Sequence, residues 1–418
     1  MSANLPVGWR RANIRRYASM KTGHTPSRSN FEYWENVTIP WFTLADVWQI
    51  RDGRRTYLGE TASKISELGL ANSAAELLPA GTVVLSRTAS VGFSGVMPIA
   101  MATSQDFWNW VCGPDLLPEY LNYQFKAMAS QLRSLNMGST HQTIYQGDAA
   151  AIQITVPPLD EQRAIADYLD RETARIDALI EEQQQLIELL RERRVAVVDS
   201  HLNPVDTWMN TTLKFLLIGI DQGVSPQAEA GLADDPGSWG VLKSGCVNRG
   251  VFRQEEHKRL SDTFDVDSRL AVAPGDLIVS RASGSPELVG SAATVHDNLT
   301  YRLILSDKLF RLRVGQLCWP RFLYWFLNSG HYRLQVRQAI SGAAGLANNL
   351  PLSSLRSFSL AVPSLDEQRR IAAYVDEQTA KIDILIAETE RFIELSRERR
   401  SALITAAVTG QIDVRAAA

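Results

Sequence analysis

A segment of 47 residues occurs twice in the chain of 418 residues, and this duplication constrains the fold more than any other feature. Residues 156–202 and 362–408 align at a constant offset of 206, with 26 of the 47 positions identical. Because twice that offset is almost the whole chain, the sequence predicts two tandem copies of one unit. The rest of each copy has diverged, so one part of the unit is constant and another part differs.

Each copy of the repeated segment predicts a long amphipathic helix. Both copies begin with proline and LDEQR, and both continue for about forty residues without glycine or proline, a rod of roughly 60 Å. Apolar side chains recur at spacings of three, four and seven, which is typical of a helix with one apolar stripe. The stripe comprises Ile165, Leu169, Ile176, Leu179, Ile180, Ile187, Leu190 and Val197, and then Ile371, Val375, Ile382, Leu385, Ile386, Ile393 and Leu403.

A single amphipathic helix of this length is not stable alone in water, so each stripe needs a partner. We expect the two helices to pair as an antiparallel coiled coil, with a pseudo-twofold axis relating the tandem copies. The alternative is that they are core helices of two separate domains. The prediction is an α+β fold in which two mixed α/β globular domains, residues 1–155 and 203–361, alternate with long helical segments, residues 156–202 and 362–418.

The two globular segments predict short strands separated by loops rich in Gly, Ser and Asn. Strand-like runs occupy residues 81–87 and 151–157 in the first half and residues 275–281 and 357–363 in the second half. One helix is expected in each half, at residues 118–133 and 320–338.

Charge is distributed unevenly along the chain, whose formal net charge is −3. Residues 1–155 contain 13 basic and 11 acidic side chains and residues 203–361 contain 16 and 14, whereas the helical segments contain 6 and 11, then 8 and 10. The helices are therefore not expected to face nucleic acid. Neither globular segment is basic enough for strong electrostatic binding by itself, so tight DNA binding would need a basic partner.

Polar loop residues and arginines in the globular segments are the candidate DNA contacts, because Arg suits phosphate and guanine while Asn and Gln suit adenine. Arg87 and Arg281 are the strongest single candidates, since each ends a matched strand; the alternative for both is a structural salt bridge. For the others the alternative is a solvated loop residue. The candidates are Thr25, Arg28, Arg54, Arg55, Arg87, Thr140, His141 and Gln142, and Ser225, Gln227, Lys243, Arg253, Lys258, Arg281, Asn348 and Asn349.

Motifs for catalysis and metal binding are largely missing from the sequence. It contains no Walker A loop, no HExxH and no His/Cys cluster with zinc spacing. One nuclease-like pattern, Asp235 followed by Glu256 and Lys258, has no counterpart in the first half. The three cysteines are far apart and no stretch is apolar enough for a membrane span, so we expect a cytoplasmic protein without a metal site.

The order of two variable globular segments and two near-identical helices resembles the specificity subunits of type I restriction–modification systems. TGHTPSRSNFEYWENVTIPWF (22–42) is similar to that family's G-x-TP-S…YW…IPW segment, and SRTASVG (86–92) to its S-R-T-G-x-x-G segment. The helix starts PPLDEQR (157–163) and PSLDEQR (363–369) also match. The second half departs from the pattern at GVSPQ (223–227), where Ser-Pro replaces Thr-Pro and the Tyr-Trp pair is absent.

This resemblance implies that each globular segment is a target recognition domain reading one half of a bipartite, asymmetric site on double-stranded DNA. The helix pair would set the gap and dock two methyltransferase subunits, which carry S-adenosylmethionine, and a motor–nuclease subunit could join. The chain itself would be non-catalytic and would hold no cofactor. Two other classes are a tandem coiled-coil adaptor joining two protein-binding domains and a self-sufficient Mg²⁺-dependent nuclease.

Overall fold

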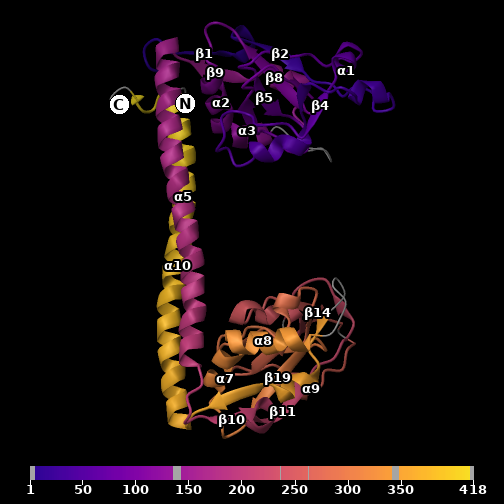
Figure 1. Cartoon of the computed structure of the whole chain (residues 1–418), viewed down its shortest axis with the longest axis vertical. Helices are drawn as coiled ribbons and strands as arrows, with labels where there is room; N and C mark the ends of the chain where they lie inside the picture. Colours follow the sequence, from indigo (N-terminus) through magenta and orange to yellow (C-terminus); the bar gives the residue numbers. More distant parts are fainter. Residues whose placement is uncertain (1–4, 135–142, 236, 262, 341–347, 415–418) are drawn as a thin grey trace. The chain divides into compact units, whose positions relative to one another are not determined.

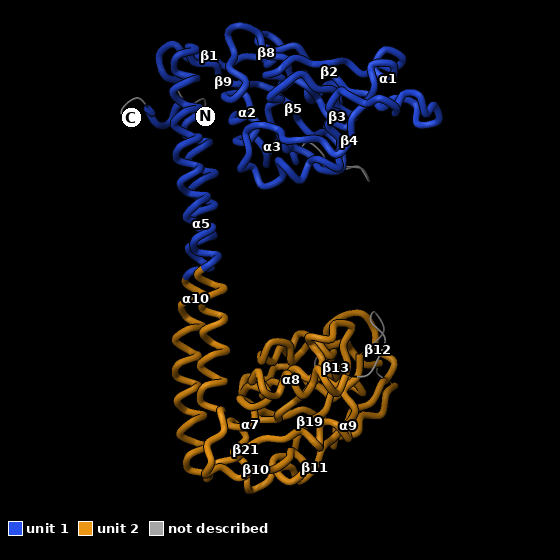
Figure 2. Tube along the Cα trace, viewed as in Figure 1, with its two compact units in different colours: residues 1–185, 389–418 blue, residues 186–388 orange. Residues whose placement is uncertain are grey.

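The computed structural model describes residues 5–134, 143–235, 237–261, 263–340 and 348–414. The chain divides into two compact units, which Figure 2 colours separately. Unit 1 comprises residues 1–185 and 389–418, and unit 2 comprises residues 186–388. Each unit thus contains one globular segment together with part of each long helix. Among the described residues, no helix has the length and apolarity to cross a membrane.

Unit 1 contains a two-stranded sheet β1-β9, a four-stranded sheet β2-β8-β5-β6 and a three-stranded sheet β4-β3-β7 in its described part. All pairs are antiparallel except β3 with β7, which are parallel. The strands are β1 (Arg10–Asn13), β2 (Ala18–Thr22), β3 (Ile39–Phe42), β4 (Ser63–Ile65), β5 (Val83–Ser86), β6 (Ser94–Val96), β7 (Ala102–Thr103), β8 (Phe107–Cys112) and β9 (Gln153–Val156). The helices of this globular segment are α1 (Glu67–Ala71), α2 (Pro118–Ala127), α3 (Ala129–Ser134) and α4 (Gln146–Ala150).

Unit 2 contains the sheets β10-β21, β11-β19-β15-β17, β12-β14-β13-β18 and β16-β20 in its described part. The strands are β10 (Met209–Thr212), β11 (Leu217–Gln222), β12 (Ala228–Glu229), β13 (Trp239–Leu242), β14 (His257–Leu260), β15 (Leu277–Ser280), β16 (Ala282–Ser283), β17 (Ala292–Thr294), β18 (Arg302–Ile304), β19 (Leu309–Val314), β20 (Asn348–Asn349) and β21 (Ser359–Val362). The helices are α6 (Leu213–Leu216), α7 (Pro320–Leu327), α8 (Gly330–Ala339) and α9 (Leu352–Ser357).

The two globular segments share their main strand order. The sheet β2-β8-β5-β6 of unit 1 corresponds in order to β11-β19-β15-β17 of unit 2, and the two-stranded sheet β1-β9 corresponds to β10-β21. Unit 2 adds β12 and the small sheet β16-β20. The four runs that the sequence predicted as strands are confirmed as β5, β9, β15 and β21.

The prediction of one continuous helix in each half is wrong, because two separate helices occupy each of the predicted ranges. In unit 1, α2 ends before Met128 and α3 begins at Ala129. In unit 2, α7 ends at Leu327 and Ser329 caps α8, accepting a hydrogen bond from the N–H of Tyr332. A serine hydroxyl that satisfies a free helical N–H favours the start of a new helix over continuation of the old one.

The long helices are α5 (Leu159–His201) and α10 (Leu365–Val408), and they lie side by side in each unit (Figure 1). In unit 1 the start of α5 packs on the end of α10. Ile165 shares a core with Ile404 and Val408, and further along α5 the carboxylate of Asp177 pairs with Arg400 at 3.0 Å. The two segments are therefore antiparallel within unit 1.

Unit 2 repeats this arrangement with the helices exchanged. Arg194 of α5 pairs with Asp383 of α10 at 2.9 Å, and Val198 shares a core with Val375. These two charged residues lie 206 positions from Arg400 and Asp177, so the same ion pair occurs in both units. The segments are antiparallel here too.

Burial of the predicted apolar stripe is confirmed for most of its members. Leu179 and Leu385, however, are 36% and 48% exposed, so these two members of the predicted stripe do not lie on the buried face. Adjacent residues on a helix point about 100° apart, and the isoleucine that follows each leucine takes the inward position. The buried members are Ile165, Leu169, Ile176, Ile180, Ile187, Leu190, Val375, Ile382 and Ile393, and the half-buried ones are Val197, Ile371, Ile386 and Leu403.

Candidate nucleic-acid interface

Arg87 directly follows β5 and is half-buried. Its guanidinium lies 4.4 Å from the ring centroid of Trp108, a cation–π contact that holds it against β8. Burial lowers the pKa of Arg87, while the negative charge of Asp106 opposes this shift. Its Nε is buried without a hydrogen-bond partner among the described residues. The side chain is thus held in place on the protein and retains an unused donor.

Arg281 occupies the corresponding place after β15 in unit 2. Its main chain pairs as that of Arg87 does: the N–H of Arg281 donates to Lys308 and its carbonyl accepts from Leu350, just as Arg87 bonds Asp106 and Ile144. The guanidinium differs, because its Nη1 donates to the carbonyl of Asp307 at 3.1 Å. The two arginines therefore share a position but have different surroundings.

In each unit, the chain returns beside the arginine after two short helices, which are α2 and α3 in unit 1 and α7 and α8 in unit 2. In unit 2, β20 pairs with β16 and brings Asn348 and Asn349 next to Arg281. Asn348 is buried rather than in an open loop, and its Nδ2 lacks a partner among the described residues. In unit 1 the equivalent bridge joins Thr88 to Thr143. The candidates that precede it, Thr140, His141 and Gln142, lie outside the described residues.

The remaining first-half candidates divide into two groups. Thr25 bonds Gln105, and Arg28 and Arg55 are exposed and stack near the rings of Trp34 and Trp48. Arg54 instead points to α5, where it pairs with Glu181 at 3.0 Å and approaches Asp177 at 3.8 Å. A DNA contact by Arg54 would have to replace these ion pairs.

The remaining second-half candidates are exposed. Ser225 and Gln227 lie between β11 and β12, and Arg253 donates to the carbonyl of Asn248. Lys258 lies on β14, whose register with β13 brings Lys243 into the same region. Lys243 is 3.7 Å from Glu256.

The nuclease-like pattern does not assemble into a metal site in the described structure. Asp235 pairs with Arg259, and Glu256 is the partner of Lys243. Within the described ranges, no group of three His, Cys, Asp or Glu side chains could hold a metal ion. The carboxylates are thus compensated by basic side chains of the protein.

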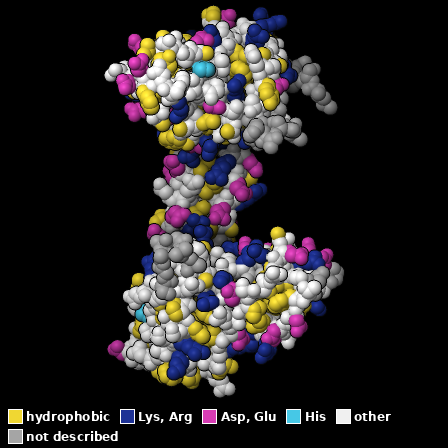
Figure 3. Space-filling view, turned by 90° about the vertical axis from the view of Figure 1, so that its right-hand side faces the viewer, with side chains coloured by type: hydrophobic (Ala, Val, Ile, Leu, Met, Phe, Trp, Pro, Cys, Tyr) yellow, Lys and Arg dark blue, Asp and Glu magenta, His cyan; other side chains and the backbone are white. Residues whose placement is uncertain are grey.

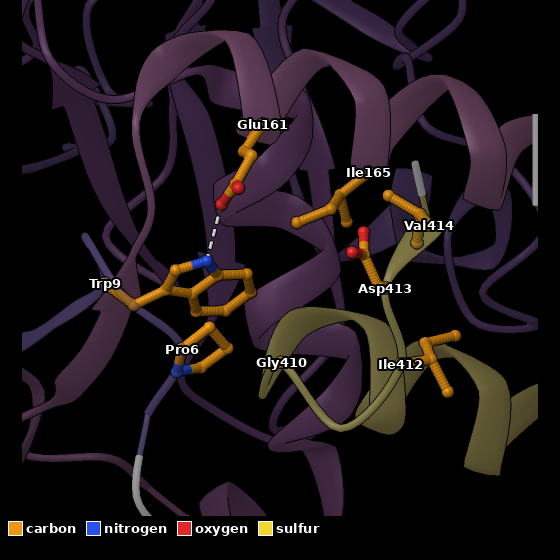
Figure 4. A pocket seen from close by; sticks show the side chains of 8 residues that line it. All are labelled: Pro6, Trp9, Glu161, Ile165, Gly410, Ile412, Asp413 and Val414. Carbon is orange, nitrogen blue, oxygen red and sulfur yellow. Dashed lines mark hydrogen bonds between the residues drawn. The ribbon is translucent and has the colours of Figure 1, made fainter. Parts of the chain in front are cut away.

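Two further features concern the surface of the described residues. Figure 4 shows a pocket in unit 1 where Pro6 and Trp9 meet the segment after α10, and where Trp9 bonds Glu161. Its volume of about 80 Å³ is far below the ~300–1,000 Å³ of ordinary ligand pockets. On the face drawn in Figure 3, basic side chains are interspersed with acidic ones, so this face carries no single continuous basic patch.

Sequence reasoning missed a set of residues in the repeated segment that attach the helices to the globular segments. Gln162 and Gln368 are completely buried and hydrogen-bonded to main-chain atoms, and Asp170 and Asp376 bond side chains of α2 and α7. Their identity in the two copies of the repeat was the available signal.

Comparison with known proteins shows which families this chain resembles. Residues 6–189 match a family model described as the type I restriction modification DNA specificity domain. The chain is 23% identical over 294 residues to the EcoKI specificity subunit of Escherichia coli K12, covering 68% of this chain and 62% of that one. It is 28% identical over 188 residues to the MjaIX specificity subunit of Methanocaldococcus jannaschii, covering 44% and 42%. The matches thus span less than two thirds of these relatives' length.

Two solved structures share the fold along nearly the whole chain. One, described as the structural basis of complex assembly and conformational transition of the type I R-M system, has a TM-score of 0.70 at 17% identity and covers 98% of this chain and 100% of its own. The HsdS subunit from Thermoanaerobacter tengcongensis has a TM-score of 0.57 at 17% identity, covering 98% and 99%. Taken together, these findings show that residues 6–189 are similar to the type I restriction modification DNA specificity domain and that the chain shares its fold with type I specificity subunits along nearly its whole length.

Proposed function

We propose that this chain is the non-catalytic subunit that selects the DNA sequence for a type I methyltransferase. Each globular segment is a target recognition domain that reads one half of a bipartite, asymmetric site. The observation that carries this proposal is the equivalent placement of Arg87 and Arg281 in two domains that share a strand order but differ in sequence. Two domains that share an architecture but differ in their surface residues suit the recognition of two different half-sites.

The two long helices are proposed to pair as a coiled coil, with a pseudo-twofold relation between the tandem copies, and to set the gap between half-sites. The repeated Asp–Arg pair in the two units supports this arrangement. A rigid connection also strengthens binding, because the first half-site raises the effective concentration of the second.

The helix segments are also the proposed docking surface for two methyltransferase subunits. Large apolar side chains remain exposed on them at positions that correspond through the 206-residue offset, and exposed apolar groups of this kind mark interaction sites. Equivalent groups in both units suit two copies of one partner. They are Leu179, Phe392 and Leu395 in unit 1, and Leu385, Leu186 and Leu189 in unit 2.

The partner would supply what this chain's residues do not provide. S-adenosylmethionine is proposed to bind the methyltransferase subunit, which would also add basic contacts to DNA. A motor–nuclease subunit could join the same assembly. The adaptor alternative predicts no sequence-dependent DNA binding with or without partners, and the nuclease alternative predicts Mg²⁺-dependent cleavage that Glu256→Ala abolishes.

Replacing Arg87 with alanine is expected to relax recognition of the first half-site by about 10- to 100-fold and to leave the second unchanged, because a bidentate Arg–base contact contributes ~1–3 kcal/mol. Arg281→Ala should do the reverse. The measurement is base-modification sequencing of DNA from cells that express each variant with the methyltransferase subunit. Arg87→Lys, which keeps the charge but loses the planar fork, separates base reading from phosphate binding. Equal relaxation of both half-sites by either variant would contradict two independent readers.

A further inference from the structure

Gln162 and Gln368 occupy equivalent positions in the two copies of LDEQR, and both side chains are completely buried. The side-chain oxygen of Gln162 accepts from the N–H of Leu117 at 2.8 Å. Its amide nitrogen donates to the carbonyls of Asp115 and Pro157, both at 2.9 Å. The glutamine thus joins the first turn of α5 to the chain just before α2.

Gln368 makes the same three bonds in unit 2. It accepts from the N–H of Trp319 at 2.6 Å and donates to the carbonyls of Leu317 at 3.1 Å and Pro363 at 2.9 Å. Leu117 and Trp319 are the N-cap residues of α2 and α7, and neither helix has a side-chain cap of its own. Each glutamine therefore fixes the start of one recognition-domain helix on the start of one long helix.

All six partners of the two glutamines are main-chain atoms. Main-chain N–H and C=O groups are the same whatever side chains the recognition domain carries. The residues around α2 and α7 have diverged, from LPEYLNYQF at 117–125 to WPRFLYWFL at 319–327. This attachment is consequently independent of the part of the sequence that varies.

A second attachment lies eight residues further along each long helix, about 12 Å away. Asp170 accepts a hydrogen bond from the hydroxyl of Tyr123 in α2. Asp376 accepts from Arg321 at 2.8 Å and from the indole of Trp325 at 2.9 Å in α7. Two points of contact fix the angle between two helices, which one point would leave free.

We infer that Gln162 and Gln368 are positioning residues that orient recognition domains of different sequence identically on their helices, and thereby keep the half-sites at one gap length. This inference rests on the proposed function. In this inference the glutamines do not contact DNA. They act by orienting the recognition domain that contacts DNA.

The test uses Gln162→Met, which keeps the buried volume but removes the three hydrogen bonds. The variant, in complex with the methyltransferase subunit, is titrated with duplexes carrying the wild-type gap or a gap one base pair shorter or longer. We expect the preference for the wild-type gap to fall by about tenfold, which is no more than the loss of one of these three buried hydrogen bonds can account for. Discrimination against base changes within the half-sites should persist. Because each preference is a ratio within one preparation, a reduced folded fraction does not alter it.

Gln368→Met should give the same result through the second domain. The matched control without effect is Gln153→Met, because Gln153 is exposed on β9 and bonds only the nearby carbonyl of Ala151. An unchanged gap preference, or an equal loss of affinity on every duplex, would overturn the inference in favour of a purely structural role. If the methionine variant does not fold, Tyr123→Phe removes only the hydroxyl that bonds Asp170 at the second attachment, and it should reduce the gap preference in the same direction. A wild-type complex without any two-part preference would instead contradict the proposed function itself.

Discussion

Cells whose chain carries one extra heptad in each long helix are expected to methylate a DNA sequence with unchanged half-sites and a longer gap. The insertions duplicate residues 179–185 of α5 and 382–388 of α10, and each duplicated stretch ends at the last residue before its helix passes from one unit to the other. Seven residues add about 10.5 Å. This length corresponds to about three base pairs at ~3.4 Å each.

Both helices must be lengthened because they pair with each other in each unit. An insertion in α5 alone would move its buried stripe out of register with α10, so this single insertion is the control and should abolish methylation at any defined motif. Three added base pairs also rotate the second half-site by more than a quarter of a turn, at about 10.5 base pairs per turn. We therefore expect weaker methylation at the longer motif than at the wild-type one. Methylation by the doubly lengthened chain at the original gap would contradict a spacing role for the helices.

Replacing Arg311 with methionine is expected to be the most destabilising of these single changes, at about 3 kcal/mol, because it removes the cation that pairs with the half-buried Asp276 and the donor of two main-chain carbonyls. Arg311 lies in β19 with a side chain only 3% exposed. It bonds Asp276 and Asp221, both at 2.9 Å, and the carbonyls of Ala271 and Arg269. Hydrogen exchange of peptides from β15 and β19, followed by mass spectrometry, would measure the loss within unit 2.

Arg313 provides the matched control on the same strand. It bonds the same Asp221 at 2.9 Å but its side chain is 47% exposed, so Arg313→Met should cost only about 0–1 kcal/mol. Equal losses from the two variants would show that burial does not determine the contribution of this network.

The same network predicts a pH dependence of the stability of unit 2. Burial alone would raise the pKa of Asp221, but the hydrogen bonds and charges of Arg311 and Arg313 outweigh it and hold that pKa below its ordinary value. The stabilisation is therefore complete above the unfolded pKa of about 3.9 and is lost as the pH falls through the lower folded value. This acid-dependent loss should be smaller in Arg311→Met.

The parts of the fold that periodicity encodes could be predicted from the sequence. The long helices and the strands β5, β9, β15 and β21 were found because their patterns are local. The exposure of Leu179 was not found, because the adjacent Ile180 satisfies the same spacing and only the partner helix selects between them. The break between α7 and α8 depends on the N-cap at Ser329. The sequence does not reveal this break, because the residues on both sides of Ser329 are compatible with a helix.

The attachment residues depend on contacts between segments far apart in sequence. Gln162 bonds main-chain atoms of residues 115 and 117, and Arg54 pairs with carboxylates more than 120 positions away. No local pattern records either contact. The identity of Gln162 with Gln368 did carry the information, but identical polar residues on a helix fit a surface for a common partner equally well. Arg311 was overlooked because a charged residue within a strand is ordinarily on its exposed face.

Base-modification sequencing tests the central claim most directly. DNA would be compared from cells expressing a type I methyltransferase subunit from the same source with this chain and from cells expressing it without this chain. The account predicts a methylated, asymmetric two-part motif with a fixed gap only where the chain is present. If the two proteins fold and associate but no such motif is found, or if the same motif is methylated without the chain, the account is contradicted.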